Sequence, residues 1–245
     1  MILTAADGMD AELDIVIPVY DEGEGILRVL DALRRDVRTS FRVLICHDYD
    51  GDTSVAAIRR ASPPIETVFV RNRSRGALEA VLSGFAASEA PAVLVYAGDD
   101  DYNAGRVDAM VARFREGFDI VVASRFMPGG CMKGAPLLKA AIIRMSAWAL
   151  HHLARVPTAD PSNGFRLFSR RVLQMIPVES KAGFAYSIEL LVKADRMGLK
   201  IAEVPVSWYE RTSGQSRFRV LRWLPQYFVW FRYAFATALL RRRTR

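Results

Sequence analysis

Short apolar runs alternate with segments of helical periodicity through the first half of the sequence, and this alternation constrains the fold more than any other feature. Residues 14–20 (DIVIPVY) form one such run, and apolar residues then recur at helical spacing over residues 26–33. The pattern continues through the run 41–46 with a helix from Thr53, the run 65–70 with a helix from Gly76, and the run 92–97 with a helix from Arg106. Strands joined by helices run parallel, and helices cover both faces of their sheet. The sequence therefore predicts an α/β fold with a mostly parallel central sheet.

The second half of the sequence loses this regular alternation. Residues 118–124 predict a further strand, reached by a right-handed crossover. There follow a Gly-rich loop (128–134), a long helical stretch (136–154), a helix (187–197) and a strand interrupted by Pro205 (200–208). With 245 residues, of which 51% are hydrophobic, the chain can bury one large core. We therefore expect one domain over residues 1–217 and a helical tail over residues 218–245.

An acidic cluster follows the fourth apolar run. Residues 93–103 read VLVYAGDDDYN, which places three carboxylates and an amide after a strand. Parallel α/β sheets bind ligands at the carboxyl ends of their strands, and clustered carboxylates are costly unless a cation compensates them. Oxygen ligands such as Asp99, Asp101 and Asn103 suit Mg²⁺ or Mn²⁺. The alternative is a solvated acidic turn that begins the next helix.

Three further polar segments favour a ligand site over an acidic turn. Residues 18–22 (PVYDE) offer an aromatic face and carboxylates that suit a base or a ribose, and residues 46–53 (CHDYDGDT) end the next strand with more carboxylates. The segments 160–166 and 210–217 place arginines among small residues, a composition suited to holding phosphate.

In order and spacing these segments resemble the family-2 glycosyltransferases, most closely the polyprenyl-phosphate sugar synthases typified by dolichol-phosphate mannose synthase. The resemblance spans residues 13–218 and is carried by VIPVYDE (16–22), HDYDGDT (47–53), AGDDDYN (97–103), DIVVASRF (119–126), DPSNGFRLFSRR (160–171), IELLVKA (188–194) and EVPVSWYERTSGQSRF (203–218). It implies a single GT-A-like domain with a nucleotide-sugar half over about residues 13–126 and an acceptor half over about residues 127–217.

The resemblance also implies roles for individual residues on the donor side. Asp99 and Asp101 would hold the metal and the diphosphate, with Asn103 at the position of a third ligand. The residues assigned to the nucleotide-sugar, UDP- or GDP-linked, are Pro18, Tyr20, Glu22, Asp48, Asp100 and Arg125. His47 stands where many relatives carry an acidic residue, which leaves recognition of the base open, and His47, His151 and His152 are expected to be structural.

On the acceptor side, the resemblance places Asn163, Gly164 and Arg166 on a loop beside the acceptor and Glu189 on a helix that faces the site. Arg211 and Arg217 lie on a loop that closes over the diphosphate. Lys133, Lys139 and Arg144, in or after the Gly-rich loop, are candidates to hold an acceptor phosphate, and solvated surface positions are the alternative for each of them.

These assignments predict a mechanism. Departure of the nucleotide diphosphate places charge on its oxygens, which a metal ion, Arg211 and Arg217 would stabilise. A lipid phosphate is already an anionic nucleophile, whereas a hydroxyl acceptor needs a base, for which Asp100, Asp160 and Glu189 are the candidates. Inversion at the anomeric carbon is implied by the resemblance.

The tail is basic and aromatic. From Arg211 onward the chain holds nine arginines and no acidic residue. At about 100° per residue, one helical face would carry Val220, Leu224, Tyr227, Phe228, Phe231 and Phe235. Such a helix fits the surface of an anionic membrane, while packing against the protein's own core or a second subunit is the alternative. We expect a cytoplasmic protein, peripheral on the cytoplasmic face of the membrane, and leave homo-oligomerisation open.

Other protein classes fit the sequence less well. A nucleotidyltransferase would carry a Gly-rich, Arg-containing loop after the first strand, and a dinucleotide oxidoreductase would carry GxGxxG, whereas residues 20–24 read YDEGE. Eight aromatic residues in the tail argue against nucleic acid as its partner. A non-catalytic protein that binds sugars or nucleotides, or a scaffold, remains the alternative to a metal-dependent glycosyltransferase.

Overall fold

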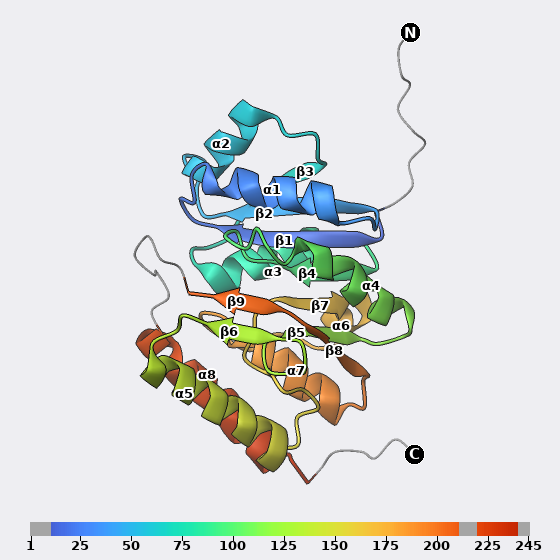
Figure 1. Cartoon of the computed structure of the whole chain (residues 1–245), viewed down its shortest axis with the longest axis vertical. Coiled ribbons are helices and arrows are strands. Elements are labelled where there is room, and N and C mark those ends of the chain that lie inside the picture. The colour runs from blue at the N-terminus through green and yellow to red at the C-terminus, as the bar shows by residue number, and fades with distance from the viewer. Residues whose placement is uncertain (1–10, 211–219, 240–245) are drawn as a thin grey trace.

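Seven strands form the central sheet of the computed structural model, in the order β3-β2-β1-β4-β7-β5-β8 (Figure 1). The structure describes residues 11–210 and 220–239. The strands of this sheet are β1 (Leu13–Val19), β2 (Phe41–His47), β3 (Thr67–Arg71), β4 (Ala92–Val95), β5 (Ile120–Ser124), β7 (Arg166–Ser169) and β8 (Ile201–Pro205). A second, two-stranded sheet consists of β6 (Cys131–Lys133) and β9 (Ser207–Tyr209).

The expected parallel sheet is confirmed. β1 pairs in parallel with β2 and β4, and β2 pairs in parallel with β3. β7 is the exception, since it runs antiparallel to both β4 and β5. The sequence analysis missed β7 because its four residues, RLFS, lack the apolar run of a buried strand, although all four are buried here.

Helices cover both faces of the sheet. They are α1 (Gly25–Asp36), α2 (Thr53–Ala61), α3 (Ala77–Ala87), the short η1 (Ala104–Arg106), α4 (Val107–Arg115), α5 (Leu137–Trp148), α6 (Arg170–Met175), α7 (Tyr186–Arg196) and α8 (Val220–Ala236). A π-helical segment, η2 (Ala149–Leu153), continues α5 directly. The predicted helix over 136–154 is thus present, with a change of geometry in its last turn.

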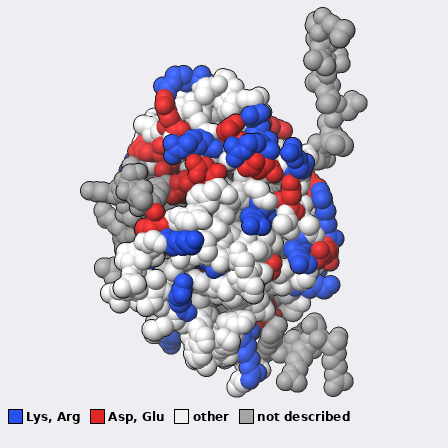
Figure 2. All heavy atoms as spheres, in the orientation of Figure 1, with Lys and Arg blue, Asp and Glu red and all other residues white. Residues whose placement is uncertain are grey.

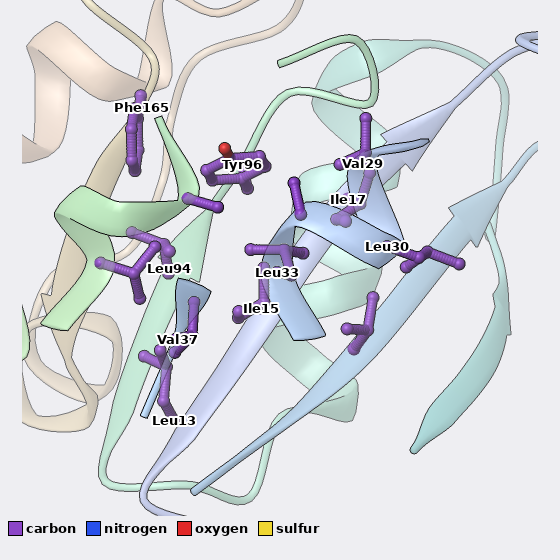
Figure 3. Packing of buried hydrophobic residues seen from close by; sticks show 14 of the residues in the cluster. Leu13, Ile15, Ile17, Val29, Leu30, Leu33, Val37, Leu94, Tyr96 and Phe165 are labelled. Carbon is purple, nitrogen blue, oxygen red and sulfur yellow. The ribbon is translucent and has the colours of Figure 1, made fainter. Parts of the chain in front are cut away.

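Alternate residues of β1 enter different layers of the core. Ile15 and Ile17 point toward Leu30 and Leu33 of α1 (Figure 3). Val16 faces the other side, where it packs with residues of β2 and α3. Burial on both faces explains the continuous apolar runs and fixes the strand ends at one edge of the sheet.

The last helix, α8, packs against the protein. Trp230 and Ala234 are buried in a cluster with residues of α7, and the Trp230 Nε1 donates a hydrogen bond to the Ser180 Oγ over 2.7 Å. The predicted apolar face is wrong in part, because Phe228 is 64% exposed and Phe235 is also exposed. Bulky apolar residues occur on both sides of this helix, so the sequence does not define which side is buried. Among the described residues, no helix is long and apolar enough to cross a bilayer.

Candidate active site

The acidic loop, residues 97–103, leaves the carboxyl end of β4 beside the end of β1. An ideal Cβ at Gly98 would lie 3.5 Å from the Pro18 carbonyl oxygen and 3.8 Å from the Glu22 Cγ, so the loop and the β1 end are in contact. Asp99 is exposed, and the side chain of Asp101 is 39% exposed. The two outer carboxylates of the loop are therefore accessible to a ligand.

Asp100, between them, is held inside the loop. It accepts hydrogen bonds from the Asn103 Nδ2 (2.7 Å) and from the backbone N–H groups of Asn103 (2.9 Å) and Tyr102 (3.3 Å). Burial raises the pKa of Asp100 to about 6, although these hydrogen bonds lower it, and the neighbouring charge of Asp99 raises it further. Asp100 therefore shapes the loop instead of projecting into solvent.

Asn103 joins the acidic loop to β9. Its Nδ2 also donates to the Ser207 carbonyl oxygen (2.8 Å), and its Oδ1 accepts from the Ser207 backbone N–H (3.2 Å). Next to it, the rings of Tyr102 and Tyr209 lie edge to face with centroids 5.2 Å apart. Both polar atoms of the amide are engaged, so Asn103 positions the loop in this structure, and its role as a metal ligand stays a prediction.

The predicted nucleotide residues gather at the ends of β1 and β2. The exposed ring of Tyr20 lies edge to face with that of Tyr49, with centroids 6.1 Å apart. The Tyr49 hydroxyl donates to the Asp21 Oδ1 over 2.6 Å, and this bond raises the pKa of Tyr49 to about 12. Asp48 accepts from the Asn72 Nδ2 and the Gly76 backbone N–H, and thereby fixes the turn before α3.

Arg125 lies in a buried ion pair. Its Nε and Nη2 contact the two oxygens of Asp160 at 2.7 and 2.8 Å, and its backbone N–H donates to the same carboxylate. Ser162 accepts a further bond from the Nη2. The Nε and Nη2 of Arg125 are thus committed to Asp160 and Ser162, and both oxygens of Asp160 are held by Arg125, so the two residues form a structural pair in this arrangement.

The predicted acceptor loop is shaped by internal contacts. Arg166 is fully buried and donates to the carbonyl oxygens of Pro161, Asn163 and Ser187, and burial lowers its pKa to about 10. The Asn163 Nδ2 donates to the Ala123 carbonyl oxygen over 2.7 Å. Arg166 therefore supports the backbone that carries Asn163 and the half-buried Gly164, instead of facing an acceptor as expected.

Glu189 also departs from its predicted role. It is fully buried on α7, where its carboxylate accepts from the backbone N–H groups of Glu179 and Ser180 and from the Lys193 ammonium. Ser180 in turn holds Trp230 of α8. Glu189 thus stabilises the packing of α7 and α8, and the expectation that it takes part in catalysis is corrected.

The three basic candidates lie along β6 and α5. Lys133 is exposed on β6, and Arg144 is exposed on α5 with its guanidinium carbon 5.9 Å from the centre of the Phe126 ring. The Lys139 Nζ contacts the Glu210 carboxylate at 2.7 Å and lies 5.0 Å from the centre of the Trp208 ring. Since β6 pairs with β9, these residues connect to the acidic loop through Ser207. Arg211 and Arg217 lie outside the described residues.

Two contributors were missed by the sequence analysis. Asp52 is buried and accepts from the backbone N–H groups of Asp21 and Ser54, which ties the β1 end to the start of α2. Its position before a predicted helix is an N-cap signal that was available. Ser207 had no such signal, because it meets Asn103 across 104 positions of sequence. His47 is buried, with its Nδ1 3.0 Å from the Tyr49 carbonyl oxygen, as expected of a structural residue.

Comparison with known proteins finds relatives that match most of this chain. The chain is 28% identical over 214 residues to the undecaprenyl-phosphate mannosyltransferase of Micrococcus luteus, covering 82% of this chain and 85% of that protein. It is 26% identical over 212 residues to the polyprenol monophosphomannose synthase of Mycolicibacterium smegmatis, covering 83% and 79%.

The fold matches that of glucosyl-3-phosphoglycerate synthase from Mycobacterium tuberculosis, crystallised with Mn²⁺, UDP and glucosyl-3-phosphoglycerate, with a TM-score of 0.67, 20% identity and coverage of 92% of this chain and 80% of that one. The model of the family "Glycosyl transferase family 2" matches residues 14–176, which include all but the first residue of β1, the acidic loop and β7. The chain belongs to glycosyl transferase family 2.

Proposed function

We propose that this glycosyltransferase moves a sugar from a nucleotide-diphosphate sugar to a polyprenyl phosphate. The observation that carries the proposal is the pair of accessible carboxylates, Asp99 and Asp101, on a loop whose Gly98 lies against Pro18 and Glu22 at the end of β1. Both relatives quoted above are named for polyprenyl-phosphate chemistry and match most of this chain.

The acidic loop suits a hard divalent cation. Mg²⁺ in phosphate-transfer sites is usually held by one or two carboxylates together with substrate phosphates. Among the described residues no group of three His, Cys, Asp or Glu side chains forms a metal cage, so Asp99 and Asp101 would share Mg²⁺ or Mn²⁺ with the diphosphate of the donor. Such an ion supplies positive charge to the departing diphosphate.

The chain's own residues complete the donor site. The exposed ring of Tyr20 offers a stacking surface at the end of β1, next to Pro18. Arg211 and Arg217 follow β9, and we assign to them the neutralisation of charge on the leaving group. β9, the last described strand before these arginines in the sequence, is bonded to Asn103 of the acidic loop.

The hydrogen bonds made by the three candidate bases favour a phosphate acceptor over a hydroxyl acceptor. Of the three base candidates, Asp160 and Glu189 have both oxygens engaged, and Asp100 accepts three hydrogen bonds within its loop. A lipid phosphate needs no base, since it is an anionic nucleophile already. Lys133 is an exposed cation within the Gly-rich loop, and we assign it to the acceptor phosphate.

The location follows from this acceptor. A polyprenyl chain stays in the bilayer, so the enzyme acts at a membrane surface, and a donor made in the cytoplasm requires the cytoplasmic face.

The test is transfer measured with purified protein, UDP- and GDP-linked sugars, Mn²⁺ or Mg²⁺, and a short-chain polyprenyl phosphate, with the matching polyprenol as control. We expect a glycosyl polyprenyl phosphate by mass spectrometry, formed only with the metal and far more slowly by Asp101→Asn. Transfer to the polyprenol alone would replace this proposal with the hydroxyl-acceptor alternative. Binding of the donor without turnover on either acceptor would favour the non-catalytic alternative.

A further inference from the structure

Two exposed tyrosines are in contact beside the acidic loop. Tyr102, which follows Asp101 directly, is 44% exposed, and Tyr209 at the end of β9 is 46% exposed. Their rings meet edge to face with centroids 5.2 Å apart, and the Tyr209 backbone N–H donates to the Tyr102 hydroxyl oxygen over 3.4 Å. Exposed apolar surface that is gathered in one place is more informative than a single exposed side chain. We call these two residues the tyrosine pair.

The carboxylates of the acidic loop lie within electrostatic range of the tyrosine pair. Burial raises the pKa of Tyr102 to about 12, and the negative charge of Asp100 contributes to this increase. The charges of Asp99 and Asp101 act in the same direction. These two residues are the ones assigned to the metal and the donor diphosphate. One end of the tyrosine pair is therefore next to the place where the departing diphosphate is held.

The other end of the tyrosine pair borders the Gly-rich loop. β6 and β9 are paired in parallel, with Lys133 opposite Tyr209 and Cys131 opposite Ser207. Because side chains alternate along a strand, Cys131 and Lys133 point to the same face of β6. Hydrogen bonding with the side chains of Ser207 and Tyr209 lowers the pKa of the Cys131 thiol. The charge of Lys133 also lowers it, so Tyr209 shares this face with the cation assigned to the acceptor phosphate.

The tyrosine pair thus lies between the two assigned phosphate sites. A transferred sugar leaves the donor diphosphate and joins the acceptor phosphate, so its ring lies between the two during transfer. The charges on the surface change across this region. Figure 2 shows acidic side chains gathered over the upper part of the visible face, and a largely uncharged lower part with scattered basic groups, where β6 and α5 lie (Figure 1). The tyrosine pair is therefore on the path of the sugar.

The chemistry of the tyrosine pair suits a sugar ring. A pyranose carries C–H groups on its faces and hydroxyl groups around its edge. The face of a phenol ring is apolar and slightly negative, so it attracts the slightly positive C–H groups and removes them from water, while the phenol hydroxyls can bond to the sugar hydroxyls. A prenyl chain is a poorer partner, because it has no hydroxyl groups and would lie beside the carboxylates.

We propose that the tyrosine pair is the surface on which the transferred sugar ring lies, and that Tyr102 and Tyr209 orient the sugar between the two phosphates. This inference rests on the proposed function for the nucleotide-sugar donor, but it does not depend on the nature of the acceptor. The nucleotide is assigned to the ends of β1 and β2. The tyrosine pair should therefore contribute to the affinity for a nucleotide-sugar and not to the affinity for the nucleotide alone.

The first test is calorimetry of the full-length protein in Mn²⁺ with UDP, GDP, UDP-glucose and GDP-mannose. Tyr102→Ala and Tyr209→Ala should each weaken nucleotide-sugar binding about fivefold to tenfold, as expected for the loss of one aromatic contact, and change nucleotide binding less than about twofold. Tyr102→Phe keeps the ring and should retain most of the affinity. Tyr20→Ala is the matched control, because Tyr20 is 49% exposed at the end of β1 and should affect nucleotide and nucleotide-sugar alike.

Four results of this titration would overturn the proposal. Equal losses for nucleotide and nucleotide-sugar would make the tyrosine pair a support of the acidic loop. Unchanged binding of both would exclude contact with the sugar. A loss in Tyr102→Phe as large as that in Tyr102→Ala would assign the effect to the hydroxyl group instead of the ring. A parent protein that binds neither nucleotide would remove the inference together with the donor site.

Cys131 gives a second measurement at the same surface. Cys131 is partly exposed whereas Cys46 is buried, so alkylation of the folded protein by iodoacetamide reports on Cys131. A bound nucleotide-sugar should slow this alkylation several-fold relative to the matching nucleotide, and Cys131→Ser should remove the signal. Equal protection by the nucleotide alone would place the nucleotide, and not the sugar, at the tyrosine pair, and would contradict the proposal.

Neither measurement contains an acceptor, which separates this inference from the identity of the acceptor. If the variants lose affinity only for the nucleotide-sugar, while the parent transfers sugar to no polyprenyl phosphate, the proposed function fails and the sugar surface stands. If the parent makes glycosyl polyprenyl phosphate and the variants bind donor as the parent does, the proposed function stands and the sugar surface fails.

Discussion

The acidic loop and the loop over residues 160–166 both contain charged and amide side chains, but only the acidic loop leaves its charges accessible. In the acidic loop Asp99 and Asp101 are accessible at the end of β4. In the other loop Asp160 is fully buried against Arg125, and Arg166 is buried among carbonyl oxygens. A charged motif at the end of a strand is therefore a ligand site only where its charges are left accessible by their neighbours.

Energetics explains why the two loops differ. Asp99 and Asp101 lie two positions apart, and the Arg28 side chain that contacts Asp101 is itself exposed, so a bound cation would compensate the like charges of this loop more fully. The Arg125–Asp160 pair has two short contacts and further hydrogen bonds, so each charge is compensated inside the protein. Removal of one partner would leave the other buried and unpaired.

The largest expected effect is on activity in the acidic loop. Asp99→Asn and Asp101→Asn should each lower turnover on the order of 100-fold to 1,000-fold, the size of effect seen when one group that stabilises transition-state charge is removed. Melting temperature should stay within about 2 °C of the parent, because surface substitutions rarely change stability. Nucleotide diphosphate release at saturating donor, with calorimetry on the same samples, checks both. Near-normal turnover by both variants would remove the acidic loop from the active site.

The buried pair should respond in the opposite way. Asp160→Ala should lower the free energy of unfolding by about 3–5 kcal/mol, because it strands the Arg125 guanidinium in the interior. Glu116→Ala is the matched control, since its partner Arg113 is exposed and such pairs contribute about 0–1 kcal/mol. Urea unfolding measures both. If Asp160→Ala unfolds like the parent but fails to bind donor, the pair belongs to the site after all.

The sequence predicted the accessible loop and much of the sheet for one physical reason: buried parallel strands are apolar throughout, and their ends are marked by turn-forming polar residues. β1, β2 and β4 all show this pattern. It did not predict the place of β7, whose pairing with β4 and β5 is set by contacts distant in sequence. Nor did it separate Arg166 from a surface arginine, because burial depends on what packs over the side chain.

Asn103 joins the acidic loop to β9, and its substitution should give an intermediate effect. Asn103→Ala removes the side-chain contacts to Asp100 and Ser207 but keeps the backbone bond to Asp100, and leaving these partners unsatisfied should cost about 1–3 kcal/mol of stability. Turnover should fall more than donor affinity does, because the loop loses its connection to β9. Unchanged turnover with a lowered metal affinity would instead restore Asn103 as a ligand.

The same substitution should also change how the stability of the folded protein depends on pH. The pKa of Asp100, about 6, is above the value of about 3.8 for an unperturbed carboxyl, so the folded protein binds this proton more tightly than the unfolded chain does. The stabilisation that this proton gives the folded protein is complete below about pH 4, and it is lost as the pH rises through about 6. Since hydrogen bonds from Asn103 lower this pKa, Asn103→Ala should raise it and shift the loss to higher pH. Melting curves in EDTA at pH 5 and 7.5 would show this shift.

The smallest expected effect tests how accessible the acidic loop is without its ligand. The Arg28 Nε lies 3.2 Å from the Asp101 Oδ2, and the Arg28 side chain is 76% exposed. An exposed pair of this kind contributes about 0–1 kcal/mol, so Arg28→Ala should leave stability unchanged.

Because the Arg28 guanidinium competes with a cation for the Asp101 carboxylate, its removal should strengthen Mn²⁺ binding by up to about fivefold, which corresponds to about 1 kcal/mol. Titration with Mn²⁺ by calorimetry measures this, with Arg34→Ala as control, since Arg34 pairs with Asp31 on the same helix. If Arg28→Ala weakens Mn²⁺ binding, Arg28 orients Asp101 for the ion, and even the accessible loop is prearranged by its neighbours.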